Sequence, residues 1–199
     1  MDALLSDLDL LAQYTAAFER LDDLCAFEVP EPLRVSTEED GWHRWRPLRF
    51  TTAPAALQAL YRGLGIPGHG ATRFPPLYET LVLSYRWAEV ELGDYRLLAN
   101  EPADDLSPLL ASLRVDENLA ATLVPNGYFP FGKGPDTDYD PVCFDFRHRQ
   151  RNGDCRIVKV AHEEILCNYH IREIAELAPN FRSLVLSTIK RANSLPGSG

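Results

Sequence analysis

The fold is decided by three short runs in the second half of the chain, Tyr128-Phe129-Pro130-Phe131, Val142-Cys143-Phe144-Asp145-Phe146 and Cys155-Arg156-Ile157-Val158-Lys159-Val160. Aromatic and β-branched residues dominate these runs, and such residues favour strands. The polar spacer at residues 147–154 predicts a loop between the second and third runs. We therefore expect consecutive strands that pair in an antiparallel or mixed sheet.

Turn chemistry upstream predicts two more strands. Val90-Glu91-Leu92 and Tyr95-Arg96-Leu97-Leu98 flank the dipeptide Gly93-Asp94. A glycine-first pair between two apolar runs is typical of a two-residue β-hairpin turn. Between this hairpin and the three runs, short helices are predicted at residues 106–113 and 117–123.

Helices are also predicted before and after the strands in the sequence. Apolar residues repeat there at three- and four-residue steps, at residues 53–64, 77–87 and 178–192. Thr51 or Thr52 can cap the first of these helices. The glycine-rich stretch at residues 63–70 predicts a loop, and it lacks the Lys and Ser or Thr of a phosphate-binding loop. The sequence thus indicates an α+β fold whose sheet is flanked by helices, with a disordered tail at residues 193–199.

An additional acidic helix is predicted at residues 2–25. Its apolar stripe consists of Leu4, Leu8, Leu11, Thr15, Phe18, Leu21 and Cys25. Two prolines, Pro30 and Pro32, end the helical pattern. We expect an acidic N-terminal helical extension at residues 1–41 and a main domain at residues 42–192. The stripe either packs on the main domain or forms a dimer or partner interface.

The composition is that of a soluble folded protein, with 199 residues, 45% hydrophobic and 25% charged. Acids stand near the N-terminus where a signal peptide would have Lys or Arg, and no apolar run approaches the ~20 residues that span a bilayer. The four cysteines are scattered without a C-x-x-C pair, which indicates reduced thiols. We therefore expect a cytoplasmic monomer or homodimer that does not bind membranes.

The net charge of -9 is concentrated in residues 1–40, which contain eleven acids and two bases. Affinity for nucleic acid depends largely on Lys and Arg, so direct nucleic-acid binding is not expected. An acidic region instead attracts a basic protein and speeds its association.

Seven residues are therefore candidates for contact with a basic protein partner. They are Asp22, Asp23, Glu38, Glu39, Asp40, Trp42 and Trp45. Tryptophan is common in binding hot spots. The alternative for Trp42 and Trp45 is that they cap the hydrophobic core.

The sequence predicts neither a catalytic set nor a cofactor. His162, Cys167 and His170 are the one group that suggests a metal, but their spacing is loose. A zinc-protease helix needs a second His four residues after His162, and Leu166 stands there. No G-x-S-x-G nucleophile motif occurs.

Four aspartates, Asp136, Asp138, Asp140 and Asp145, lie close together in the sequence. A calcium loop of the EF-hand type needs a glycine after its third acid and a distant Glu, and Pro141 and Val142 break that pattern. We expect these aspartates to be solvated or to cap backbone N–H groups.

Several short motifs follow one another in a recognisable order. They are Tyr128-Phe129-Pro130-Phe131-Gly132, Asp140-Pro141-Val142-Cys143-Phe144-Asp145, Val160-Ala161-His162-Glu163-Glu164 and Leu177-Ala178-Pro179-Asn180-Phe181-Arg182-Ser183-Leu184, preceded by Leu64-Gly65-Ile66-Pro67 and Pro75-Pro76-Leu77-Tyr78-Glu79-Thr80-Leu81. Their order and spacing resemble the SUKH superfamily, which includes the fungal Smi/Knr cell-wall regulators and many bacterial proteins. The resemblance covers residues 42–189. Asp138-Tyr139-Asp140-Pro141 departs from it, because the family usually has a glycine-aspartate step there.

This resemblance implies a mixed α+β fold without catalytic residues. Bacterial members are similar to immunity proteins, which bind and neutralise polymorphic toxins, often nucleases. The expected function is therefore immunity-type protein binding. The alternatives are a regulatory or scaffold protein without a toxin partner and a metal-dependent enzyme that uses His162.

Overall fold

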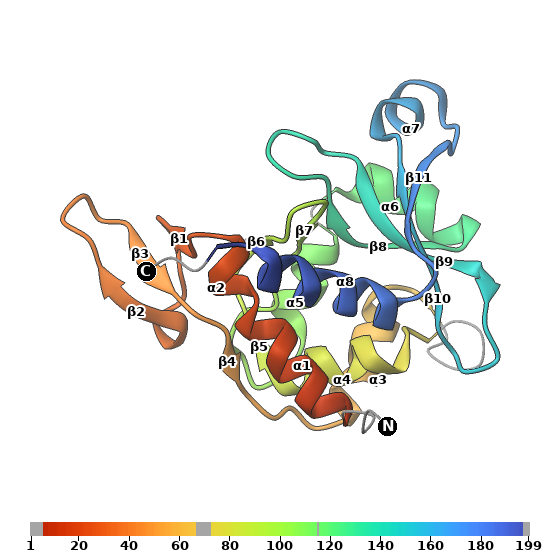
Figure 1. Ribbon diagram of the computed structural model, residues 1–199. Helices are drawn as coiled ribbons and strands as arrows, with labels where there is room; N and C mark the ends of the chain where they lie inside the picture. Colours follow the sequence, from red (N-terminus) through yellow and green to blue (C-terminus); the bar gives the residue numbers. More distant parts are fainter. Residues whose placement is uncertain (1–5, 67–72, 115, 197–199) are drawn as a thin grey trace.

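The protein is described by a computed structural model over residues 6–66, 73–114 and 116–196 (Figure 1). The helices are α1 Asp7–Ala16, α2 Phe18–Leu21, α3 Ala55–Gly63, α4 Pro76–Ser84, α5 Ser107–Leu113, α6 Glu117–Leu123, α7 His162–Asn168 and α8 Phe181–Ser194, with 3₁₀ turns at Glu31–Leu33 and Val124–Asn126. The strands are β1 Cys25–Ala26, β2 Arg34–Thr37, β3 His43–Trp45, β4 Leu48–Arg49, β5 Tyr85–Arg86, β6 Val90–Glu91, β7 Arg96–Leu97, β8 Tyr128–Lys133, β9 Pro141–Arg149, β10 Cys155–Val160 and β11 Glu173–Ala178. Their pairings are antiparallel, which confirms the expected α+β fold with sheets flanked by helices.

The central sheet has six strands in the order β11-β10-β9-β8-β7-β6. The three apolar runs form β8, β9 and β10, as predicted, and Phe144 of β9 lies opposite both Phe129 and Ile157. The predicted hairpin forms β6 and β7, with Val90 opposite Leu97. Gly93 in its turn has φ 90°, a backbone conformation that glycine adopts at little cost.

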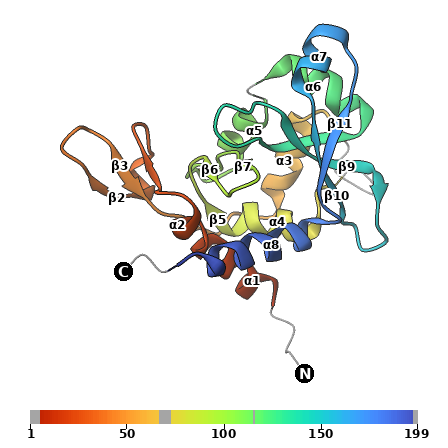
Figure 2. The same cartoon turned by 45° about the horizontal axis from the view of Figure 1, so that its top comes forward.

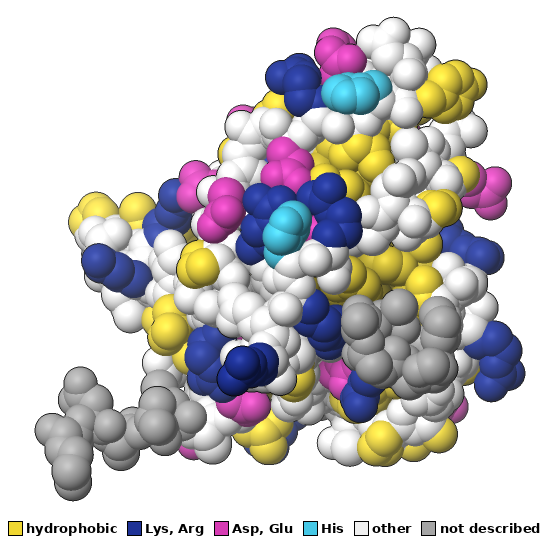
Figure 3. Space-filling view, turned by 90° about the vertical axis from the view of Figure 1, so that its right-hand side faces the viewer, with side chains coloured by type: hydrophobic (Ala, Val, Ile, Leu, Met, Phe, Trp, Pro, Cys, Tyr) yellow, Lys and Arg dark blue, Asp and Glu magenta, His cyan; other side chains and the backbone are white. Residues whose placement is uncertain are grey.

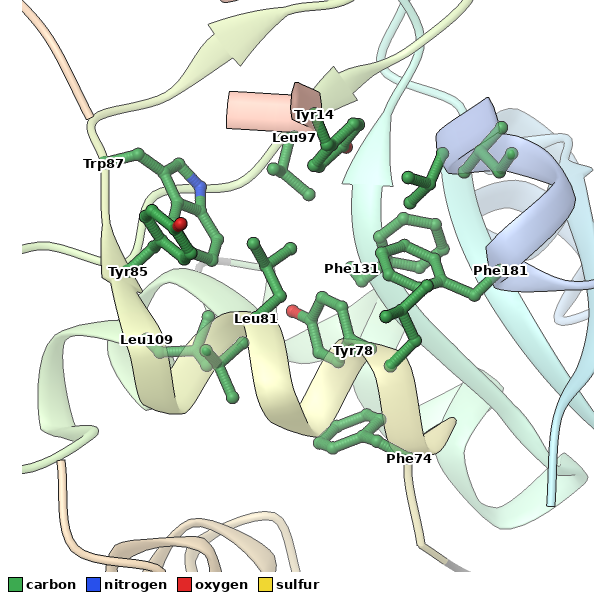
Figure 4. Close-up of a cluster of buried hydrophobic side chains, with 14 of the residues drawn as sticks. Tyr14, Phe74, Tyr78, Leu81, Tyr85, Trp87, Leu97, Leu109, Phe131 and Phe181 are labelled. Carbon is green, nitrogen blue, oxygen red and sulfur yellow. The ribbon is translucent and has the colours of Figure 1, made fainter. Parts of the chain in front are cut away.

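One face of this sheet packs against α4 and α8 through aromatic rings (Figure 4). The rings of Phe131 and Phe144 stack with their centroids 4.1 Å apart. Tyr78 of α4 and Phe181 of α8 approach the Phe144 ring to 5.0 and 5.7 Å. Helix α1 packs outside α4 and α8, where Tyr14 meets the edge of Phe181 at 6.5 Å.

The opposite face is covered by α6 and α7. Side chains alternate between the two faces of a strand, so Tyr128, Cys143 and Val158 point away from the aromatic cluster. They pack against Leu123 of α6 and Ile165 of α7. The sheet is thus buried on both faces over much of its area.

Residues 25–45 form a second sheet with the strand order β1-β3-β2, which projects from the body (Figures 1 and 2). We call these residues the arm. All four residues of β2 are exposed. The base of the arm is held in the main core by Leu24, Val29, Leu33 and Trp45. The domain boundary expected at residue 41 falls in the turn between β2 and β3.

The continuous helix predicted at residues 2–25 is wrong, because α1 ends at Ala16 and α2 ends at Leu21. Asp22 and Asp23 accept hydrogen bonds from the N–H groups of Leu24 and Cys25, each at 3.1 Å. Such local side-chain bonds compete with the helix. Leu24 then adopts φ 49° and turns the chain into β1.

The apolar stripe of this segment is only partly as predicted. Leu11, Thr15 and Phe18 are buried in the body, whereas Leu8 is exposed. Leu4 lies outside the described residues. The stripe therefore packs on the same chain, with Leu10 and Tyr14 as further buried members.

The helix predicted at residues 77–87 ends early, at Ser84, because two buried side chains take over its C-terminus. Arg86 Nη1 donates to the carbonyl oxygens of Val82 and Tyr85 at 2.7 and 3.0 Å. Asn100 Nδ2 donates to the same two oxygens at 3.1 and 2.9 Å. Tyr85–Arg86 thereby becomes β5, and Thr52 binds Arg86 instead of capping α3.

Near the C-terminus the structure differs from the sequence prediction at several elements. The loop expected at residues 147–154 begins only after Arg149, and α7 and β11 were not predicted. Helix α8 begins at Phe181, because Asn180 caps it by accepting the N–H of Ser183 at 2.8 Å. Residues 193 and 194 of the expected tail belong to α8.

Two of the predicted segments, a loop and the C-terminal tail, lie partly outside the described residues. These parts are residues 67–70 of the glycine-rich stretch and residues 197–199 of the tail. Among the described residues, no helix combines the length and the apolar character needed to cross a membrane.

We predict that Tyr78→Phe leaves the free energy of unfolding unchanged or raises it by up to about 1 kcal/mol. The Tyr78 hydroxyl is buried without a hydrogen-bond partner in the described part of the chain, so its removal relieves a desolvation cost. Tyr14→Phe is the matched control, because the Tyr14 hydroxyl lies 2.7 Å from that of Tyr95 in the core. That variant should lose about 1 kcal/mol in urea unfolding. Equal losses in both variants would contradict the prediction.

Candidate functional site

The arm brings most of the predicted partner-binding residues to one tip. Glu38, Glu39 and Asp40 lie in the turn between β2 and β3, and all three are exposed. The turn is closed by the N–H of Glu38, which donates to the carbonyl oxygen of Trp42 at 2.8 Å. Gly41 has φ 88°, which a side chain at this position would disfavour. The carboxylates are therefore displayed on an ordered turn.

Beside these acids lies an exposed aromatic pair that the sequence did not reveal. The rings of Phe27 and Trp42 meet edge to face with their centroids 6.4 Å apart. Phe27 is 61% exposed and Trp42 is 44% exposed. They meet because β1 pairs with β3, which places Ala26 opposite His43. Contiguous exposed apolar surface with a polar rim is a common feature of interaction sites.

The remaining predicted residues have structural contacts. Trp45 is buried in the core, so it caps the hydrophobic core and is not exposed to a partner. Asp22 is half-buried, and its Oδ2 accepts the N–H of Glu91 at 2.7 Å. Burial raises the pKa of Asp22. Asp23 is exposed and turns the chain into β1 through its bond to Cys25.

Asp22 and Asp23 also line a hollow of about 430 Å³ between α2 and the β6–β7 hairpin. Glu89 and Glu91 complete its acidic lining, and Arg96 is its basic member. Arg96 donates to Glu91 at 2.9 Å and lies 3.5 Å from Glu89. Four carboxylates against one guanidinium leave this hollow acidic.

On another side of the molecule, Lys and Arg side chains gather around a histidine (Figure 3). Asp145 is fully buried there and accepts hydrogen bonds from Arg147, His148 and Arg156, each at 2.8 Å. Burial alone would raise the pKa of Asp145, but these three donors hold that pKa well below its usual range. Glu173 of β11 accepts from Arg156 as well, at 2.8 Å. The network therefore ties β9, β10 and β11 together.

Two other aspartates of the sequence cluster cap backbone groups. Asp138 Oδ1 accepts the N–H of Asp140 at 2.9 Å, and Asp140 Oδ1 accepts the N–H of His162 at 2.9 Å. Asp136 is exposed. In the described residues, no three His, Cys, Asp or Glu side chains are grouped so that they could hold a metal ion. His162 instead binds Asp140, and Cys167 and His170 are exposed.

No family model matches this chain, and no curated protein matches it either. We therefore infer a function from the geometry of the arm. Its tip combines Glu38, Glu39 and Asp40 with the aromatic pair of Phe27 and Trp42. Such a surface offers charge for attraction and apolar area for affinity.

We predict that Asp145→Asn lowers the free energy of unfolding by about 2 kcal/mol at pH 7, because it removes the buried charged acceptor that the partly exposed side chains of Arg147, His148 and Arg156 share. The pKa of Asp145 is lower in the folded chain than in the unfolded chain, where it is about 3.9. Its contribution is therefore complete above about pH 4 and is lost as the pH falls through the folded pKa.

Urea unfolding between about pH 4 and pH 2 should show a steeper loss of stability in the wild type than in Asp145→Asn. Asp104→Asn, at an exposed acid, is the control and should follow the wild type at every pH. Parallel curves for the wild type and Asp145→Asn would contradict the prediction.

Proposed function

We propose that this chain is a non-enzymatic, cytoplasmic protein-binding module that uses the arm to bind a basic protein. The observation that carries the proposal is the exposed Phe27–Trp42 pair beside the carboxylates of Glu38, Glu39 and Asp40. The arm contains five acids and two bases over residues 25–45. A basic partner would be steered to this tip by charge and held there by the two rings.

The specific form we propose is an immunity-type protein that neutralises a toxin. Two observations support it. The motif order over residues 42–189 resembles the SUKH superfamily, whose bacterial members include such proteins. An acidic tip also suits the basic active cleft of a nuclease, where carboxylates can take the place of substrate phosphates.

The test uses the products of the reading frames that flank this gene. We expect one of them to be toxic when it is expressed alone and harmless when this chain is co-expressed. The two proteins should then co-purify. A flanking product that binds without being toxic would favour a regulatory or scaffold role, and the absence of any binding would contradict the proposal.

We predict that the triple variant Glu38→Gln, Glu39→Gln and Asp40→Asn lowers the association rate constant with this partner about tenfold at low salt. The salt dependence of that rate should become flatter, because the attracting charges are gone. Asp22 is not substituted, because its carboxylate accepts the backbone N–H of Glu91. Stopped-flow mixing at several salt concentrations measures both effects.

The matched control removes three exposed acids elsewhere, through Asp104→Asn, Glu117→Gln and Glu163→Gln. It changes the net charge equally and should affect the association rate much less. Trp42→Ala should act on the dissociation rate instead, raising it about tenfold, because it removes apolar contact area and not charge. Equal effects of the two triple variants would show that only net charge matters and that the arm is not the binding surface.

A further inference from the structure

A groove of about 390 Å³ lies between α5, α6, β8 and α7, away from the tip of the arm. Its lining is mostly apolar and includes Leu98, Leu113, Leu119, Pro130, Tyr139 and Leu166. Tyr139 and Leu166 are largely exposed, at 60% and 46%. A concave apolar surface of this size is typical of sites that enclose a ligand group.

One polar group of the groove, His162, is held in a fixed orientation. Asp140 Oδ1 lies 2.7 Å from His162 Nδ1 and also accepts the N–H of His162. Asp140 is itself fixed, because its N–H donates to Asp138 and Asp138 forms an ion pair with Lys159 of β10. Asp140, in the loop from β8 to β9, therefore leaves this imidazole at the start of α7 little freedom to turn.

The bond to Asp140 determines what His162 can recognise. A carboxylate only accepts hydrogen bonds, so its bond to His162 requires a hydrogen on Nδ1. In the neutral imidazole the other ring nitrogen, Nε2, is then a hydrogen-bond acceptor. Lys133 and Glu89, also in the lining, pair with each other at 3.0 Å, and the Asp116 carboxylate there accepts the N–H of Leu119 at 2.9 Å. The groove thus suits an apolar group that carries one hydrogen-bond donor, and a phenol is such a group.

Glu89 joins the groove to the acidic hollow, because it lines both. A segment that places a phenol in the groove would therefore carry its neighbouring residues past Glu89, Glu91, Asp22 and Asp23. Lys or Arg next to the phenol would be favoured there. The two adjoining surfaces together fit a tyrosine flanked by basic residues.

We propose that the groove binds a tyrosine side chain of the basic partner, with the tyrosine hydroxyl donating to His162 Nε2 and flanking Lys or Arg residues at the acidic hollow. The proposal rests on the proposed function for its source of ligand, since the partner is a basic protein. It adds a second contact region to the arm. It also assigns His162 to the tyrosine hydroxyl and not to a metal ion.

The probe is the peptide acetyl-Lys-Tyr-Lys-amide, titrated into the full chain by two-dimensional NMR. We expect saturable shifts of amide signals that line the groove. Replacing the peptide tyrosine by phenylalanine should weaken binding about fivefold, the effect of one hydrogen bond. His162→Phe should abolish this difference between the two peptides, because it keeps a ring and removes the acceptor. His170→Phe is the matched control, since His170 is exposed and does not line the groove.

Two further probes test whether the ligand is a tyrosine in a basic segment or a small phenol. Acetyl-Glu-Tyr-Glu-amide should bind more weakly than the lysine peptide by about threefold or more, owing to repulsion at the acidic hollow. Free p-cresol should also bind more weakly than the lysine peptide. If p-cresol binds as tightly, the groove is a site for a small phenol and the proposal is overturned. Equal affinity for tyrosine and phenylalanine peptides in the wild type also overturns it.

Failure of this proposal is distinguishable from failure of the proposed function. The arm variant Glu38→Gln, Glu39→Gln and Asp40→Asn should leave the affinity for acetyl-Lys-Tyr-Lys-amide unchanged, because these residues do not line the groove or the hollow. Ala120→Trp should fill the groove, and its fold is checked by circular dichroism. The His162→Phe variant and the altered peptides do not involve residue 120, so they test the proposal even if Ala120→Trp does not fold. Loss of partner binding in the arm variant together with intact peptide binding supports both proposals.

Discussion

The structure depends on one aromatic contact, the stacking of Phe131 and Phe144 on neighbouring strands with their centroids 4.1 Å apart. Tyr78 of α4 and Phe181 of α8 both meet this pair, at 5.8 and 5.9 Å from Phe131. The two helices come from distant parts of the sequence, so the cluster fixes both against the sheet at once. Each ring that it buries stabilises the fold by about 1.5–3 kcal/mol. Helix α1 then packs on the helices and not on the sheet.

Buried polar groups give this apolar packing a single arrangement. Arg86 and Asn100 are fully buried and hold the last carbonyl groups of α4. Asp154 accepts the N–H groups of Cys155 and Phe181 at 2.9 and 3.0 Å, which joins the start of β10 to the start of α8. Apolar side chains could slide past one another at small cost, whereas an unpaired buried donor or acceptor costs about 1–3 kcal/mol. These bonds therefore select one register for the helices.

The sequence predicts those parts of the fold that depend on local pattern. Local signals predicted the apolar strands β8, β9 and β10 and the turn at Gly93, and the structure confirms them. The break at Leu24 and the end of α4 depend on side chains that bind backbone groups, so periodicity alone did not show them. The candidate site is harder to predict from the sequence than the fold. Phe27 meets Trp42 only because β1 pairs with β3, and Asp140 reaches His162 across 22 positions. Nothing near either residue in the sequence signals its partner.

For the proposed binding role, the construction of the arm would separate binding from stability. Leu24, Val29, Leu33 and Trp45 anchor its base in the core, where substitutions of buried side chains cost several kcal/mol. The tip carries exposed residues, and substitutions at such positions usually change stability by less than about 0.5 kcal/mol. Charges and rings at the tip can therefore change with little effect on folding. A protein that must match the surface of one particular partner benefits from such a tip, because its specificity can be altered while the aromatic core stays the same.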